Sequence, residues 1–257
     1  MVLSAFRAEA PAAVERLTVA IVVGLLAAAA WIALSLSSGS GLHHLHHLSA
    51  VTVASMRFQL FFVATWTVMT VAMMLPTSLP VIATLHTFAS ERSDRLLLVA
   101  LTILGYLIAW SAFGALVLTG YRSWQWLLAS SPWLAERAPA GAPLLLLLAG
   151  AFQFSALKYT CLEKCRSPFS FVIEHWRGGR ERWQALRLGI DHGVFCVGCC
   201  WALMLLMFAV GAGNLVWMLI LALLMAVEKN VRWGRRLSAP VGAALLAWGV
   251  MLLAFHL

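Results

Sequence analysis

The segment Asp191–Trp201, DHGVFCVGCCW, begins a long apolar run and holds three of the five cysteines of the chain. Residues three or four positions apart share a face of a helix, so a helix here would place His192, Cys196 and Cys199 within one narrow arc. Two further sulfur residues lie at the edge of this arc, Cys200 and Met207. Thiolate, imidazole and thioether groups suit a soft transition metal, with Cu(I) favoured and zinc or iron as alternatives. The competing interpretation is that the cysteines are small buried hydrophobes.

The composition indicates a protein that crosses a membrane several times. Of 257 residues, 62% are hydrophobic and 11% are charged, and the mean hydropathy is +0.89. Soluble domains carry about 25% charged residues, so a soluble fold is excluded. Five cysteines are an odd number and lie in clusters, which is unlike a disulfide framework. We expect no cleaved secretory signal and take the first apolar run as a retained helix.

The apolar runs predict the fold class. A bilayer core of about 30 Å is crossed by roughly 20 apolar residues in a helix. We therefore expect an all-α bundle, one transmembrane domain over residues 1–257, with about seven spans. The sixth span is the shortest, follows a tight GAGN turn in which Asn214 can cap the helix, and could be re-entrant. The expected spans are 17–36, 57–78, 96–119, 143–161, 188–211, 214–230 and 238–256.

The distribution of basic residues predicts the orientation. With the N-terminus inside and seven spans, 15 of the 18 Lys and Arg residues fall on the inner side. The three outside are Arg57, Arg122 and Arg137. This bias follows the positive-inside rule and places the C-terminus outside, in a bacterial cytoplasmic membrane. The net charge of +8 is therefore a topological signal, and we expect no nucleic-acid partner. The inner segment HWRGGRERWQALR, residues 175–187, is typical of an amphipathic helix held by anionic lipid.

A histidine-rich stretch, GLHHLHHL at residues 41–48, lies in the first outer loop. Its four imidazoles could collect Cu(II) or another divalent metal. Equally, three leucines at this spacing could dip into lipid and leave the imidazoles wet. The candidate ligands are His43, His44, His46 and His47.

The second span carries methionines at helical spacing. Met69 and Met73 share a face, with Met74 to one side, and such a stripe serves either as core packing or as a soft-metal path. Pro76 and Pro80 should end or kink the helix and free carbonyl groups that another donor must satisfy. In the third span, small residues such as Gly105 are expected to permit close helix packing.

The fourth span ends in FQFSALKYTCLEKCRSPF, residues 152–169. Lys158, Cys161 and Cys165 share a face at the inner boundary, where a nearby ammonium favours thiolate. The alternative is a lysine that snorkels to the interface beside incidental thiols. We expect Lys158 to form an ion pair with Asp191, since both lie just inside the membrane on consecutive antiparallel helices. Because Cys196 would lie about 13 Å deeper than the inner edge, two separate metal sites are favoured over one.

Three sequence blocks together resemble a known family. They are AMMLPTSLP, FQFSALKYTCLEKCRSPF, and HGVFCVGCCWALM with the following GNLVWM and EK. They are similar to a bacterial family of predicted metal-binding integral membrane proteins, catalogued as a domain of unknown function, over about residues 60–230. The resemblance implies that all five cysteines are candidate ligands, with Glu228 in the EK block. It also implies a small soluble partner protein. The histidine-rich loop lies outside these blocks.

These observations favour a membrane metal-handling protein that translocates or delivers copper and leans away from enzymatic activity. No ATP-binding loop is evident, so a gradient or a partner would drive movement. A thiol–quinone oxidoreductase is the enzymatic alternative, using the same cysteines as an exchanging pair. The third possibility is a non-catalytic accessory subunit whose cysteines serve helix packing.

Overall fold

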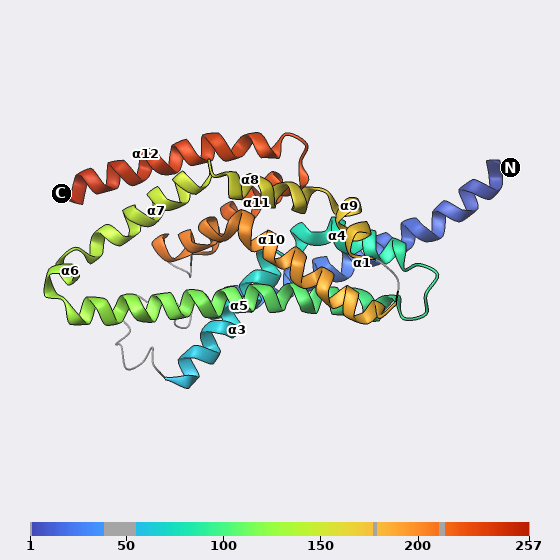
Figure 1. Ribbon diagram of the computed structural model, residues 1–257, viewed down its shortest axis with the longest axis horizontal. Helices are drawn as coiled ribbons and strands as arrows, with labels where there is room; N and C mark the ends of the chain where they lie inside the picture. The colour runs from blue at the N-terminus through green and yellow to red at the C-terminus, as the bar shows by residue number, and fades with distance from the viewer. Residues whose placement is uncertain (1, 39–54, 177–178, 211–213, 257) are drawn as a thin grey trace.

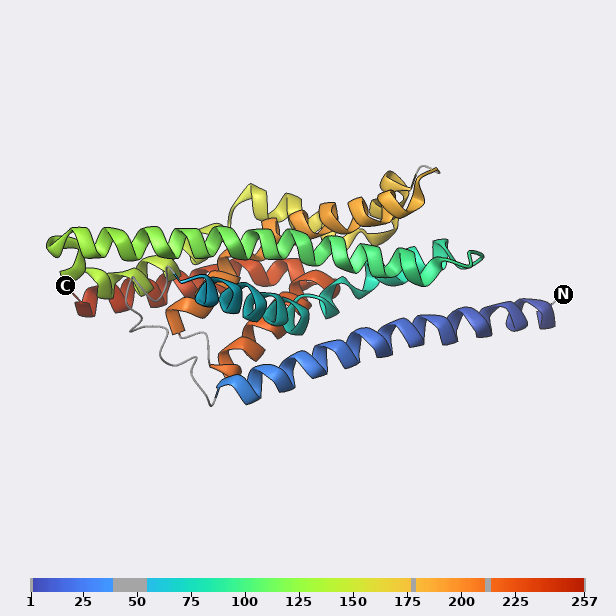
Figure 2. The same cartoon turned by 90° about the horizontal axis from the view of Figure 1, so that it is seen from below.

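A computed structural model describes residues 2–38, 55–176, 179–210 and 214–256, which are helical with no strand among them. The fold class predicted from the sequence is therefore confirmed as all-α. Figure 1 shows an elongated bundle in which α1 begins at one end of the long axis and α12 finishes at the other. Figure 2 shows α1 along one edge, with its first turns extending beyond the other helices.

The described helices are α1 (Val2–Ser38), α3 (Met56–Met73), α4 (Leu79–Phe88), α5 (Arg95–Ser130), α6 (Pro132–Glu136), α7 (Gly141–Phe152), α8 (Ala156–Arg166), α9 (Pro168–His175), α10 (Glu181–Val210), α11 (Leu215–Asn230) and α12 (Ser238–His256). Short 3₁₀ turns are η2 (Pro76–Ser78), η3 (Ala138–Ala140) and η4 (Gly234–Leu237).

Five segments of the described chain are long and apolar enough to cross a membrane. A sixth candidate is the pair of helices 138–152 and 156–166, which are bent by 64° relative to each other. The helix α11 has 16 residues, short of a full span. The count of seven spans and their orientation thus stay predictions. The five segments are Leu17–Ser37, Met56–Met73, Arg95–Ser130, Glu181–Phe208 and Gly234–Phe255.

The outer surface of the bundle is apolar where these segments lie. On α1, Leu25 and Leu36 are 65% and 76% exposed, and on α10 Val194 is 57% exposed. Large exposed aliphatic side chains at this density are unfavourable in water and are what a helix presents to acyl chains. The five cysteines, in contrast, belong to the buried core, together with Met69, Met73, Met74 and Met207.

The helices α5 and α10 form the closest contact in the bundle. A Cβ atom added at Gly189 would overlap the carbonyl of Thr102, and one added at Gly105 would overlap the carbonyl of Leu186. The Thr102 hydroxyl donates a hydrogen bond of 3.0 Å across this contact to the carbonyl of Ala185. The prediction that small residues of the third span permit close packing is therefore confirmed.

The second span ends earlier than predicted, at Met73, and the chain continues through η2 into α4. Pro76 cannot continue the helical hydrogen bonding. The carbonyl of Ala72, which the missing N–H of Pro76 leaves without a helical donor, accepts a hydrogen bond of 3.2 Å from the indole of Trp31 on α1. The Thr77 and Ser78 hydroxyls donate to the carbonyl of Met74 at 2.7 and 3.4 Å. The expectation of a proline break that frees a carbonyl for another donor is confirmed.

The expected span 143–161 is broken in the structure by a bend of 64°. The helix α7 ends at Phe152, and α8 begins after Ser155, whose side chain accepts a hydrogen bond of 3.1 Å from the backbone N–H of Lys158. The physical reason is that the segment from Lys158 to Arg166 carries four charges, and charged side chains are unfavourable in contact with acyl chains. The bend lets α8 pack against α10. Asn214 caps α11 as expected, accepting from the N–H of Trp217 at 3.0 Å.

We predict that Gly189→Ala destabilises the bundle, because its new methyl group would meet the α5 backbone, which cannot move aside as a flexible side chain can. The expected cost is about 1–3 kcal/mol. Thermal unfolding in detergent, followed by size-exclusion chromatography, measures it. Gly120→Ala on α5 is the matched control, since an added Cβ there has nothing within 4 Å. Equal unfolding temperatures for both variants would contradict the close contact.

Candidate functional site

All five cysteines are free and buried, and they converge on one place between α8 and α10. Cys165 of α8 lies within hydrogen-bonding contact of Cys196 and Cys199 of α10. A Cβ added at Gly198 would lie 2.6 Å from the sulfur of Cys161, so α10 has a glycine where the second α8 thiol approaches it. We call the five cysteines the thiol cluster. The expectation of two separate sites is wrong, because the bend before α8 turns its cysteines toward α10.

A lysine ammonium lies inside the thiol cluster. The Nζ atom of Lys229, on α11, is 2.9 Å from the sulfur of Cys196 and 3.8 Å from that of Cys200. It is also 3.7 Å from the sulfur of Met74 and 3.3 Å from the hydroxyl of Thr77. The side chain is 5% exposed. Sulfur and oxygen atoms from two segments, α10 and the break after α3, therefore surround one buried positive charge.

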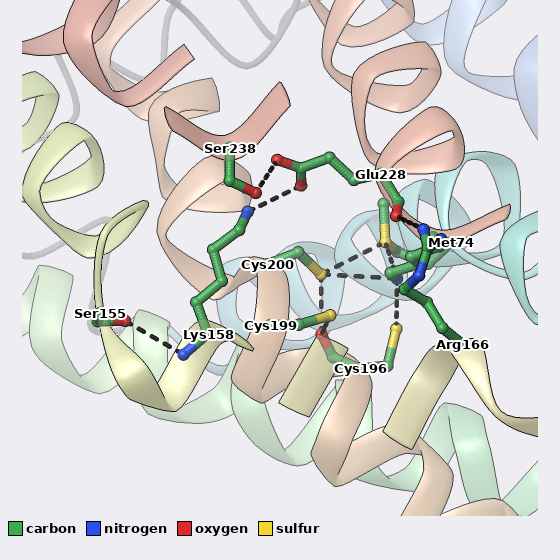
Figure 3. A network of polar contacts seen from close by, with 10 residues as sticks. Met74, Ser155, Lys158, Arg166, Cys196, Cys199, Cys200, Glu228 and Ser238 are labelled. Carbon is green, nitrogen blue, oxygen red and sulfur yellow. Dashed lines mark hydrogen bonds and ion pairs between the residues drawn. The ribbon is translucent and has the colours of Figure 1, made fainter. Parts of the chain in front are cut away.

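The thiols of α10 point toward this ammonium or toward their own helix. The Cys199 and Cys200 thiols donate to the carbonyl of Cys196 at 3.1 and 2.8 Å, and the Tyr106 hydroxyl lies 3.0 Å from the Cys196 sulfur. Figure 3 shows the three sulfur atoms together with Met74. Within the described residues, no three His, Cys, Asp or Glu side chains already form a metal-binding geometry. An ion would have to displace the ammonium and redirect the thiols.

The methionine that contacts the thiol cluster is Met74. Its sulfur accepts a hydrogen bond of 3.7 Å from the Cys200 thiol, and its side chain is fully buried. The predicted pair Met69 and Met73 is buried in the same core, as is Met207. The break after Met73 explains the difference, since it takes Met74 off the regular face of α3.

His192 is buried beside the thiol cluster without contacting it through a ring nitrogen. Its ring stacks on Tyr106 with centroids 5.7 Å apart and meets Phe171 edge-on at 5.6 Å. Neither ring nitrogen has a hydrogen-bond partner. Tyr106 thus stands between this imidazole and Cys196. The four histidines of the predicted outer loop, His43, His44, His46 and His47, lie outside the described residues.

Lys158 pairs with Glu228, and the prediction of a Lys158–Asp191 pair is wrong. The Nζ atom of Lys158 lies 2.8 Å from the Glu228 carboxylate, whose second oxygen accepts from the Ser238 hydroxyl at 2.9 Å (Figure 3). Asp191 instead contacts the His175 ring nitrogen at 3.1 Å and Arg187. The bend before α8 directs Lys158 into the bundle, where α11 supplies the carboxylate.

Arg166, at the end of α8, links this helix to α11 and to the turn that follows α11. Its guanidinium donates to the backbone carbonyls of Glu228 and, at 2.9 Å, of Arg232. Ser238 opens α12, so the Glu228 carboxylate links α8, α11 and α12. These contacts hold the C-terminal turn of α11, and with it Lys229, against α8.

Four residues at the site are not among the ligands predicted from the sequence: Lys229, Met74, Tyr106 and Thr77. One signal was available: Glu228 and Lys229 are adjacent charges in an otherwise apolar segment, and neighbours on a helix point in different directions. Two such side chains need two separate partners when buried. Tyr106 carried no comparable signal, because aromatic residues are common in apolar helices.

The fold and the site together define a class: a helical bundle, with several helices long and apolar enough to span a membrane, built around a buried thiol cluster. A family model described as PpoB2, copper chaperone, matches residues 63–252. The chain belongs to this copper chaperone family, which gives it a copper-handling role. Comparison with curated proteins and with solved structures finds no match. The match agrees with the metal-related character of the family that the sequence resembles, although it carries a different description.

We predict that Lys158→Met destabilises the protein by about 3–5 kcal/mol, because the buried Glu228 carboxylate would lose its cationic partner. The measurement is the free energy of unfolding in detergent. Lys164→Met is the matched control, because its pair with Glu174 is exposed at the surface and contributes less than about 1 kcal/mol. The double variant Lys158→Met/Glu228→Gln should recover part of the loss. A Lys158→Met protein as stable as the control would contradict the role of this pair.

Proposed function

We propose that the protein is a membrane-embedded copper chaperone that binds Cu(I) as cargo in the thiol cluster and passes it on to an acceptor. The observation that carries this proposal is the convergence of five buried thiols and the Met74 thioether from three segments far apart in the sequence. Thiolate and thioether ligands together select Cu(I) among the common metals. The family description supports copper as the cargo.

Burial of the thiol cluster suits a carrier of a reactive ion. All five cysteines are at most 9% exposed, so bulk water and small oxidants reach them poorly. A chaperone must also release its cargo, and a site that needs rearrangement before binding holds an ion less tightly than a preorganised one. The thiols of the cluster make hydrogen bonds to the Cys196 carbonyl. Breaking these bonds when an ion binds costs free energy and so lowers the affinity.

We further infer that the helices cross a bacterial cytoplasmic membrane as one domain with the N-terminus inside. The positive-inside bias supports this orientation. In that arrangement Cys161 and Cys165, with the basic residues that follow them, lie toward the cytoplasm. Delivery to a small soluble partner protein, or translocation of the ion through the bundle, would then use this end of the thiol cluster.

The other two functions gain no specific support from the structure. A thiol–quinone oxidoreductase needs a cysteine pair that an oxidant can reach, whereas all five thiols are buried and none is in a disulfide. A purely structural role for the cysteines does not account for an ammonium directed at their sulfur atoms in an apolar core.

We predict that the purified protein binds Cu(I) under anaerobic conditions and that Cys196→Ser/Cys199→Ser abolishes this binding. Hydroxyl groups are poor ligands for a soft cation, so the loss should exceed about 100-fold in affinity. Competition with a chromophoric Cu(I) chelator gives the dissociation constant, and elemental analysis gives the stoichiometry. Equal, negligible copper content in the wild type and the variant would overturn the proposed function.

A methionine pair provides a second test of the site. Met74→Leu keeps volume but removes the thioether that contacts Cys200, and it should weaken Cu(I) binding by about tenfold. Met251→Leu is the matched control, because Met251 is half-exposed on α12. An unchanged affinity in both variants would remove Met74 from the copper site while leaving the cysteine test intact.

A further inference from the structure

Lys229 is the feature of the site that a copper-binding role alone does not explain. None of the contacts described for its Nζ atom is with a carboxylate: they are with Cys196, Cys200, Met74 and Thr77. The neighbouring carboxylate of Glu228 is directed at Lys158 instead. Burying an ammonium group among candidate metal ligands is unfavourable in free energy, so its presence there calls for a function.

We propose that Lys229 determines the specificity of the thiol cluster, because its positive charge makes the site accept a monovalent soft cation and reject a divalent one. The inference rests on the proposed copper function and deepens it. In the metal-free protein the ammonium occupies the space between the sulfur ligands. When Cu(I) binds, the ammonium withdraws toward the Thr77 hydroxyl, which it already contacts at 3.3 Å, and remains next to the site.

Charge balance in a medium of low dielectric constant gives the direction of the selectivity. The two cysteine sulfur atoms that contact the ammonium are those of Cys196 and Cys200. With Cys196 and Cys200 as the thiolates and the other thiols, Cys199 included, still protonated, two thiolates, one Cu(I) ion and one ammonium sum to zero charge. The two displaced thiol protons leave to solvent. The same ligands with Zn(II) leave one uncompensated positive charge. Without the lysine the balance reverses: the zinc complex is neutral and the copper complex is anionic.

The Lys229 ammonium cannot escape the repulsion by the bound ion by extending into water. Its stem is anchored on α11, whose last turn is held by the contacts of Arg166 and by the Lys158–Glu228 pair. The side chain is 5% exposed. A unit charge that stays about 5–6 Å from the ion, in an effective dielectric of about 20, changes affinity by about 100-fold for each unit of charge on the ion. The second charge of Zn(II) should therefore carry a penalty of about 10- to 100-fold.

The test compares Cu(I) and Zn(II) binding by the same purified protein. Dissociation constants for both ions, measured anaerobically by chelator competition, give the ratio Kd(Zn)/Kd(Cu). Lys229→Met should lower this ratio by about 10- to 100-fold. A ratio within one variant cancels any common change in the thiols. If Lys229→Met does not fold, as judged by size-exclusion chromatography, Lys229→Gln removes the same charge and should lower the ratio likewise.

Two control variants separate charge from shape and from distant electrostatics. Lys229→Arg keeps the charge and should keep the wild-type ratio within about threefold. Lys164→Met removes an exposed charge on α8 and should leave the ratio unchanged. If the wild type binds Cu(I) but the neutral Lys229 variants keep its ratio, the specificity role is overturned and the copper site stands. If the wild type binds no Cu(I), the proposed function itself fails, and with it this inference.

Discussion

The need to give polar partners to two buried lysines on adjacent helices is the constraint on which the arrangement of this protein depends. Lys158 and Lys229 are both enclosed, and an isolated ammonium in an apolar interior is strongly unfavourable. The protein gives the first lysine a carboxylate at 2.8 Å and directs the second into sulfur and hydroxyl groups. Because Glu228 and Lys229 are consecutive, one turn of α11 carries both the carboxylate that pairs with Lys158 and the second buried lysine. The positions of α8, α11 and α12 follow from them.

The chemistry of the site depends on two breaks in helices that the sequence would otherwise continue. The proline break after Met73 places Met74 beside Cys200, and the break between Phe152 and Ala156 turns Cys161 and Cys165 toward α10. A straight second or fourth span would leave these sulfur atoms apart. In a bilayer such breaks are tolerated only where protein groups satisfy the freed backbone, which Trp31 does at the first break and Ser155 at the second.

The sequence predicted the features that depend on local chemistry. The helical class, the proline break, the cap at Asn214, the close packing at Gly105 and the grouping of His192 near the α10 cysteines all follow from residue type and spacing. The burial of the thiols also agrees with the prediction, because a face of soft ligands directed at lipid could not enclose a metal ion. Each of these inferences needs only one helix or one turn.

Features that depend on which helices meet were not predictable. The partner of Lys158 was assigned to the next helix in the chain, because nothing in the sequence shows that α11 passes closer to it than the start of α10. Two metal sites were favoured because depth along straight helices separates Cys161 from Cys196. The 64° bend invalidates that calculation. A serine followed by a charged segment can mark such a bend, but the angle itself is set by tertiary packing.

The contact between α5 and α10 and the joint before α8 differ in how much relative motion of the helices they allow. The helices α5 and α10 touch backbone to backbone at Gly105 and Gly189, so their separation cannot decrease and their sliding is restricted. The helix α8, by comparison, is linked to α7 through three residues, Gln153 to Ser155, outside regular helix. A rotation at this joint would change the distance between the α8 and α10 sulfur atoms while the α5–α10 pair stays fixed. The sulfur–sulfur distances across the thiol cluster therefore depend on the Lys158–Glu228 pair and the Arg166 contacts, which fix α8 against α11.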